Sequence, residues 1–323
     1  MNVLIVRNDK LGDFITALPA CYILKQHLPD AHISALISPI NASIADACDF
    51  IDDVIVDHGQ STKELSNILK KKNFDLSITL FSNTRVAIAQ WLTGIPKRVA
   101  PATKFAQIFY NNRIIQRRSQ VKMAEFEYNI QLVVKTFPSI DTNFPKPLLP
   151  FADEEKQSVF QTFCKQLDIT KKVIAFHPGF GGSSDANWNI MEYIEMAMIL
   201  EAREDLEIVF TFGPGDESFL QAFHHNKGDL KAKVYESKES VLEFAKLISS
   251  FKLFVSTSTG TFHLASLVGT PTMTFFADSL FASSKRWKGI GDINLQHNIM
   301  IPQEPELRKV CFEQVKKDLL SLV

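Results

Sequence analysis

Four loops in the sequence combine residues that could bind or react with a substrate, and each follows a stretch predicted to be a β-strand. In the first, Gly12 and Asp13 come shortly after residues 2–6, a predicted strand that is apolar from Val3 to Val6. Glycine permits a tight turn or a close backbone approach. Aspartate is common at a helix N-cap, but it can also act as a general base toward an attacking hydroxyl. Both roles are compatible with Asp13.

The second loop, residues 177–188, is rich in glycine and serine and lies between a predicted strand and a predicted helix. Backbone amides and hydroxyls in such a loop could hold a phosphate. The spacing matches neither a Walker A loop nor a GxGxxG motif, so a simple glycine-rich turn is an equal alternative. The candidate phosphate contacts in this loop are Gly179, Gly181, Gly182, Ser183 and Ser184.

The third and fourth loops also end predicted strands. Glu217 could bind ribose hydroxyls, although an acid at the start of a helix is the simpler interpretation. Ser258, Thr259 and Gly260 begin a predicted helix that carries His263. Hydroxyls and amides at a helix N-terminus form a second candidate anion site. His263 could reach a bound phosphate or could be structural.

Strands must alternate with helices to position these loops. Short apolar runs and helical stretches alternate through residues 2–101, and residues 14–29 are predicted to be a single helix. The pattern resumes after residue 153 and closes with a helix over 304–323. Such alternation is typical of a doubly wound parallel α/β sheet, which binds ligands at the carboxyl ends of its strands. Residues 138–153 contain four prolines and interrupt the pattern, so we place a domain boundary there.

The charge pattern points to an anionic partner for the first half of the chain. The 323 residues have a net charge of −1, and we expect no nucleic-acid partner. Yet residues 76–124 contain no Asp or Glu and eight bases: Arg85, Lys97, Arg98, Lys104, Arg113, Arg117, Arg118 and Lys122. A basic face on one half of a neutral protein suggests anion binding. An ordinary solvated surface is the alternative.

Cysteine usage and hydropathy predict a cytoplasmic protein. The four cysteines are widely spaced and contain no CxxC pair, which argues against a disulfide scaffold or a zinc ribbon. No apolar run is long enough for a membrane span, and the N-terminal run is too short for a signal peptide. The basic face adds the hypothesis of peripheral contact with the inner face of the cytoplasmic membrane.

The four loops, in this order, resemble those of the ADP-heptose:lipopolysaccharide heptosyltransferases of glycosyltransferase family 9. The similar segments are residues 7–20, 177–188, 256–271 and, more weakly, 284–291. The resemblance implies the GT-B fold, with two Rossmann-like domains facing each other across a cleft. Residues 1–150 would form the acceptor-binding domain. Residues 151–323 would form the nucleotide-sugar domain, with its last helix packing back on the first domain.

The same resemblance implies an inverting transfer that needs neither metal nor cofactor, with ADP-heptose as donor and the lipopolysaccharide inner core as acceptor. Asp13 becomes the candidate base, assisted by Lys10. The implied donor contacts are Gly181, Gly182, Ser183, Glu217, Ser258, Thr259, Gly260 and His263. The implied acceptor contacts, toward Kdo carboxylates and lipid phosphates, are Arg113, Arg117, Arg118 and Lys122.

Two positions depart from the family pattern. Ala186 stands where the best-known members have a lysine, and Ser258 where they have an aspartate. Lys285 or Arg286 could replace the missing positive charge. Two alternatives therefore stay open. One is a GT-B enzyme that uses another nucleotide sugar, as a transferase or a 2-epimerase. The other is a non-catalytic nucleotide-sugar-binding protein, which predicts donor binding without turnover and indifference to Asp13→Asn.

Overall fold

Two six-stranded parallel sheets organise the protein in the computed structural model, which describes residues 1–179 and 187–323. Each sheet belongs to its own unit, Met1–Pro145 or Lys146–Val323. Gly181, Gly182, Ser183, Ser184 and Ala186, to which the sequence assigned donor contacts or a departure from the family, lie outside the described residues.

The sheet of the first unit has the strand order β3-β2-β1-β4-β5-β6. Its central strand β1 is buried along almost its whole length, as expected for a parallel sheet covered on both faces. The order reverses direction between β1 and β4, and such a switch point is where this fold binds ligands. The strands are β1 (Asn2–Arg7), β2 (His32–Ile37), β3 (Asp53–Val56), β4 (Leu76–Thr79), β5 (Lys97–Pro101) and β6 (Asn112–Ile114).

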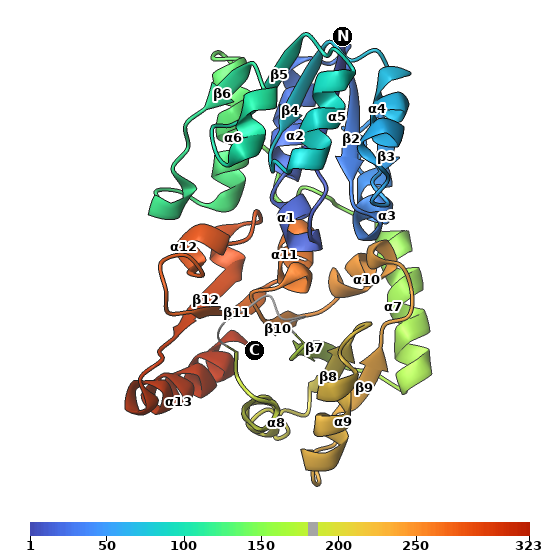
Figure 1. Cartoon of the computed structure of the whole chain (residues 1–323). Helices are drawn as coiled ribbons and strands as arrows, with labels where there is room; N and C mark the ends of the chain where they lie inside the picture. The colour runs from blue at the N-terminus through green and yellow to red at the C-terminus, as the bar shows by residue number, and fades with distance from the viewer. Residues whose placement is uncertain (180–186) are drawn as a thin grey trace. The chain divides into compact units, whose positions relative to one another are not determined.

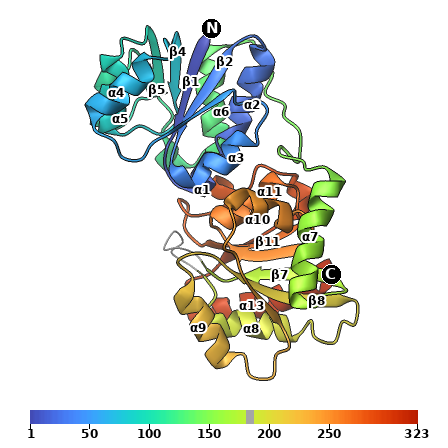
Figure 2. The same ribbon diagram turned by 90° about the vertical axis from the view of Figure 1, so that its right-hand side faces the viewer.

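Helices cover both faces of this sheet, with α4 and α5 on one side and α2 and α6 on the other (Figures 1 and 2). The helix predicted over residues 14–29 is two helices, which are separated at Thr16 and Ala17. Strand β6 and helix α6 were not predicted. The helices are α1 (Leu11–Ile15), α2 (Leu18–His27), α3 (Ala42–Asp46), α4 (Thr62–Lys70), α5 (Thr84–Leu92) and α6 (Glu125–Thr136), with 3₁₀ turns η1 (Pro39–Asn41), η2 (Phe105–Phe109) and η3 (Arg118–Gln120).

The second unit repeats this topology, with the order β12-β11-β10-β7-β8-β9 and its switch point between β7 and β10. The loops after β7 and β10 are the two that the sequence analysis considered for phosphate binding. The strands are β7 (Lys172–His177), β8 (Leu206–Phe212), β9 (Lys233–Glu236), β10 (Leu253–Thr257), β11 (Thr272–Ala277) and β12 (Gln296–Ile301).

In this unit, α7, α10 and α11 lie on one face of the sheet, whereas α8, α9 and α13 lie on the other (Figures 1 and 2). Most of these elements match the predicted pattern, but strand β12 was not predicted. The helices are α7 (Asp153–Leu167), α8 (Ile190–Met198), α9 (Glu217–Asn226), α10 (Val241–Ile248), α11 (Gly260–Leu267), α12 (Ser284–Trp287) and α13 (Pro305–Leu322), with the 3₁₀ turn η4 (Ile293–Leu295).

The last helix, α13, packs on the core of the second unit. Its Phe312, Val315 and Leu319 are buried in one apolar cluster with residues of α8 and the sheet. The Phe312 ring lies 5.1 Å from that of Trp188. That the last helix also packs on the first domain stays a prediction. Helix α13 follows the edge strand β12 after a short link, and its apolar stripe finds its partners in that same unit.

Within residues 1–179 and 187–323, none of the helices is both long enough and apolar enough to cross a lipid bilayer.

Candidate active site

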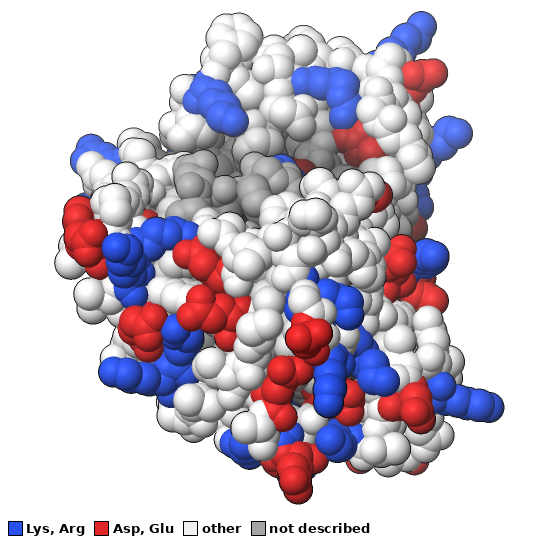
Figure 3. Space-filling model, turned by 90° about the horizontal axis from the view of Figure 1, so that it is seen from below, with Lys and Arg blue, Asp and Glu red and all other residues white. Residues whose placement is uncertain are grey.

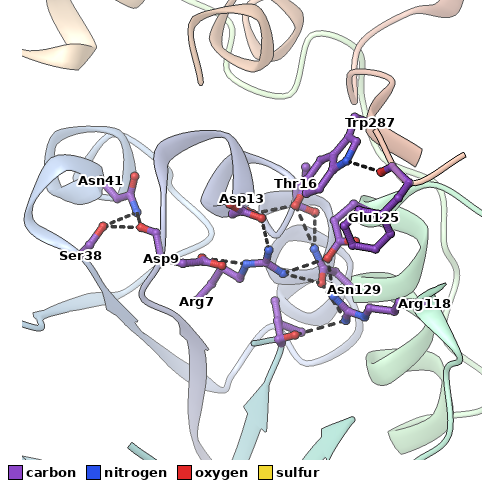
Figure 4. A network of polar contacts seen from close by, with 12 residues as sticks. Arg7, Asp9, Asp13, Thr16, Ser38, Asn41, Arg118, Glu125, Asn129 and Trp287 are labelled. Atoms are coloured by element: carbon purple, nitrogen blue, oxygen red, sulfur yellow. Dashed lines mark hydrogen bonds and ion pairs between the residues drawn. The ribbon is translucent and has the colours of Figure 1, made fainter. Parts of the chain in front are cut away.

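A buried arginine ends β1 and binds the loop that follows it. Arg7 is only 2% exposed, and its guanidinium faces three carboxylates (Figure 4). Its Nε donates to Asp9 over 2.9 Å, its Nη2 to Asp13 over 2.5 Å, and its Nη1 to Glu125 over 3.4 Å. A charge this deeply buried is tolerated only when it is paired and hydrogen-bonded. Arg7 therefore determines where all three carboxylates lie.

Asp13 is the most exposed of these carboxylates, at 21% for its side chain. It is the third residue of α1, and Lys10, whose side chain is exposed, occupies the N-cap position. No side chain caps α1, so the N-cap interpretation of Asp13 is corrected. The Asp13 carbonyl accepts a hydrogen bond from Thr16 Oγ1 over 2.7 Å. The carboxylate is thus held in one orientation while remaining accessible to a reactant.

Two residues of helix α6 bind Arg7 and the residue that follows α1. Its first residue, Glu125, is buried and pairs with Arg118 as well as with Arg7. Asn129, one turn later, accepts from Arg7 over 3.2 Å. The Asn129 amide nitrogen donates to the Thr16 carbonyl and hydroxyl, over 3.0 and 3.1 Å. Asn129 thus links the C-terminal end of α1 to the same guanidinium that binds Asp13.

The clustered charges shift two pKa values. Burial lowers the pKa of Arg7, but Asp9, Asp13 and Glu125 outweigh this effect and raise it. Burial also raises the pKa of Asp9, from 3.8 to about 6, and repulsion from Asp13 adds to the rise although Arg7 opposes it. Asp9 therefore gains a proton in mildly acidic solution. Its carbonyl is fixed by Ser38 Oγ over 2.7 Å.

The four bases proposed for acceptor binding do not form one exposed set. Arg113 on β6, Arg117 and Lys122 are exposed. Arg118 turns inward instead, where it donates to Glu125, to Gln116 and to the Leu80 carbonyl. This inward orientation gives Arg118 a role in supporting the cluster around Arg7.

In the second unit, the ends of β7 and β8 meet at a buried carboxylate. Asp216 accepts from the Gly213 amide over 2.8 Å and lies 3.7 Å from His177 Nε2. His177 Nδ1 lies 3.0 Å from the Thr211 hydroxyl. Burial lowers the pKa of His177, although Asp216 opposes the shift. A Cβ at Gly179 would lie 2.0 Å from Asp216 Oδ1, so any larger residue at this position would displace the Asp216 side chain.

Glu217 begins α9 and is exposed. Its carboxylate accepts from the backbone amides of Glu217 itself and Gly215, which lowers the pKa of this group. The position fits the simpler interpretation of an acid in the first turn of a helix. It also keeps an ionised carboxylate accessible at the carboxyl end of β8.

The loop after β10 leads directly into α11. Thr259 is its N-cap residue, and Gly260 is its first helical residue. The Thr259 hydroxyl lies 2.9 Å from that of Thr261, and Ser258 is half-buried beside them. His263 is buried, with its ring centroid 6.3 Å from that of Trp287. This helix N-terminus therefore places amides and three hydroxyls at the switch point of the second sheet.

Sequence reasoning missed Arg7, Asp9, Glu125 and Asn129. The signal for Arg7 was present, because a charged residue directly ended an apolar strand. Glu125 gave no comparable signal, since it lies 118 residues from Arg7 and meets it only through folding. Among the described residues, no group of three or more His, Cys, Asp or Glu side chains has the geometry of a metal site. The carboxylates of Asp9, Asp13 and Glu125 converge on the guanidinium of Arg7.

Comparison with known proteins identifies the family to which this chain belongs. The model of glycosyltransferase family 9 (heptosyltransferase) matches residues 63–317. A Haemophilus influenzae protein named "Putative glycosyltransferase" is 36% identical, covering 98% of this chain and 93% of its own. Lipooligosaccharide heptosyltransferase 2 of Campylobacter jejuni is 21% identical, covering 86% and 81%.

Among solved structures, the E. coli ADP-heptose lps heptosyltransferase II has a similar fold. Its TM-score to this chain is 0.82 at 17% sequence identity, and the match covers 100% of this chain and 98% of that one. At this identity the likeness concerns the fold, which is the GT-B fold with its two parallel sheets.

Proposed function

The chain belongs to glycosyltransferase family 9, the heptosyltransferase family, and we propose that it transfers a heptose from ADP-heptose to the lipopolysaccharide inner core or a related envelope glycan. The proposed transfer inverts the anomeric centre and uses no metal or cofactor. The names of two relatives support the sugar and the nucleotide: one is a lipooligosaccharide heptosyltransferase and another an ADP-heptose lps heptosyltransferase.

The observation that carries the proposed chemistry is the Asp13 carboxylate, accessible and held by Arg7 at the switch point of the first sheet. Asp13 takes the proton of the acceptor hydroxyl. That oxygen forms a bond to the anomeric carbon, and the bond from this carbon to the diphosphate oxygen breaks. ADP leaves with the electron pair. A positioned base of this kind contributes about 10²–10⁴-fold to the rate. Lys10, the neighbouring N-cap residue, assists at the reacting sugar.

The second unit supplies the proposed donor contacts. The diphosphate binds the amides at the start of α11 and the hydroxyls of Ser258 and Thr259, and His263 lies about one turn further along the same helix. Preorganised amides and hydroxyls stabilise the charge that develops on a leaving phosphate. Glu217 binds the ribose. The glycine-rich loop that begins at Gly179 completes the donor site.

The acceptor contacts are the exposed bases Arg113, Arg117 and Lys122, which match the carboxylates and phosphates of an inner-core acceptor. Arg118 contributes indirectly. It pairs with Glu125 and so supports Arg7, which in turn orients Asp13. We therefore assign Arg118 to positioning of the base.

The test compares Asp13→Asn with Asp30→Asn, which changes an exposed aspartate in the same unit. Transfer from ADP-heptose to an inner-core acceptor without acyl chains is measured by mass spectrometry, and ADP binding by calorimetry. We expect Asp13→Asn to lower kcat about 10²–10⁴-fold and to leave the ADP affinity unchanged. Asp30→Asn should retain full activity.

Three outcomes would contradict parts of this proposal. Full turnover by Asp13→Asn would remove the assigned base. Preference for UDP over ADP would contradict ADP-heptose as the donor, although the assignment to the GT-B fold would stand. Nucleotide binding without turnover in the wild-type protein would favour a non-catalytic binding protein.

A further inference from the structure

Four exposed apolar side chains gather on the outer surface of α5 and η2. Of the seven large hydrophobic residues that are exposed in the first unit, Trp91 and Leu92 lie on α5 and Phe105 and Ile108 on η2. The two elements pack together, because the half-exposed Phe109 ring lies 6.0 Å from Trp91 and 6.4 Å from Phe105. We call these five residues the apolar patch.

The local geometry of η2 explains why its aromatic and aliphatic side chains face solvent. In a 3₁₀ turn, residues three apart project in the same direction, so Phe105 and Ile108 share the outer side. The inner side carries Ala106, which is buried with Ala87 of α5 and Ala100 of β5. Tyr110 completes this buried cluster, whereas Phe105 and Ile108 remain outside it. Phe105 is 68% exposed, a level at which burial in the core contributes little to holding it there.

Basic residues flank this patch along the sequence, and no acid lies within the same stretch of the chain. Residues 76–124, which include α5, η2 and β6, contain no Asp or Glu. Lys104, directly before Phe105, is exposed with its Nζ 4.6 Å from the Phe81 ring centroid. Arg113 is exposed on β6, the edge strand that follows η2. Exposed aromatic rings thus lie in an acid-free stretch of the chain that also carries the two exposed bases Lys104 and Arg113, which we call the basic rim.

We propose that the apolar patch and its basic rim bind the surface of an anionic phospholipid bilayer. Aromatic and aliphatic side chains insert into the boundary between headgroups and acyl chains, where Trp and Phe are favoured. Lys104 and Arg113 of the basic rim contact lipid phosphates, each adding about a fivefold gain in affinity. The inference extends the proposed function, on which it rests for its purpose, because an inner-core acceptor is carried by a lipid. Vesicle binding itself requires no glycosyl transfer.

A bilayer fits this surface better than a second copy of the chain. A two-fold interface places the same surface on both subunits, so the basic rims of two copies would face each other and repel. A stable interface also uses about 20–30 residues on each side, many more than the five residues of the patch. An anionic lipid surface supplies the opposite charge. Contact with it does not require an interface of about 20–30 residues.

The test is co-flotation of the full chain with phosphatidylglycerol–phosphatidylcholine vesicles and with pure phosphatidylcholine vesicles. The wild-type protein is expected to bind the anionic vesicles and to dissociate as salt is raised. Phe105→Ser combined with Ile108→Ser should weaken binding about 30–100-fold, since each loses about a tenfold contribution from apolar burial. Lys104→Gln should weaken it about fivefold.

Matched controls come from α13 of the second unit, where Val310 is also 68% exposed. Acidic and basic side chains are intermixed on the face of that unit shown in Figure 3. Val310→Ser and Lys309→Gln should leave vesicle binding unchanged. All of these variants should also retain transfer to an acceptor without acyl chains, so this readout separates the membrane inference from the proposed function.

The inference is overturned if the wild-type protein binds both kinds of vesicle equally or neither. Equal losses in the patch variants and in Val310→Ser would also overturn it. So would sedimentation that shows wild-type dimers which the Phe105→Ser, Ile108→Ser double variant converts to monomers. If vesicle binding follows the expectations while transfer fails, the membrane surface stands and the proposed function falls.

Discussion

Replacing Asp9 with asparagine should change how the stability of the protein depends on pH. The folded protein raises the pKa of Asp9 from 3.8 to about 6, because the carboxyl is buried and lies beside Asp13, and Arg7 only partly compensates. A carboxyl that binds its proton more tightly in the folded state stabilises folding most strongly at low pH. This contribution is lost as the pH rises through the interval from 3.8 to about 6.

The magnitude follows from the two pKa values. At 1.36 kcal/mol per pH unit, the interval corresponds to about 3 kcal/mol. About 2 kcal/mol of this falls between pH 4.5 and 7.5, where unfolding is readily measured. Asparagine resembles the protonated acid at every pH. The free energy of unfolding of Asp9→Asn, relative to wild type, should therefore increase by about 2 kcal/mol from pH 4.5 to 7.5.

The assay is urea unfolding of both proteins at several pH values, with Asp52→Asn as a control of opposite sign. Burial would raise the pKa of Asp52, but the Ile33 amide and Lys25 outweigh it and lower the pKa. Asp52 therefore stabilises folding at neutral pH, and this contribution is lost as the pH falls. Asp52→Asn should become relatively less stable as the pH rises. A difference for Asp9→Asn that is constant with pH, or that follows Asp52→Asn, would refute the reasoning about the charge cluster.

Three further substitutions should change stability by amounts that urea unfolding at pH 7 can measure. Glu125→Gln should cost about 3 kcal/mol, because it removes the buried anion that Arg118 pairs with; a loss below 1 kcal/mol would show that the pair is not needed. Gly179→Ala should cost about 1–3 kcal/mol by displacing Asp216, and unchanged stability would mean that Asp216 moves freely. Ser240→Ala should cost about 1 kcal/mol, since its hydroxyl caps α10; no loss of stability in Ser240→Ala would contradict the cap.

Local sequence patterns predicted much of the fold. Apolar runs of strand length alternate with amphipathic stretches, and this alternation predicted two parallel α/β sheets with reactive loops at their carboxyl ends. It failed where the local signal was weak. Strand β6 has only three residues, two of them exposed, and every residue of β12 except the last is half-exposed. Edge strands lack the continuous apolar run that identifies the centre of a parallel sheet.

The sequence by itself identified Asp13 as a residue that could act as a base at the end of the first strand, because its neighbours determine that position. Only the tertiary structure decided what holds it. Arg7 meets Glu125 across 118 residues, and Glu125 also pairs with Arg118, which holds that side chain inward. Likewise, Trp91 and Phe105 are apolar residues that sequence would assign to a core, yet folding leaves them exposed. The periodicity of the sequence indicates which side of a helix or strand is apolar. Which charged side chains pair, and which apolar side chains stay exposed, depends on the elements that the fold brings together.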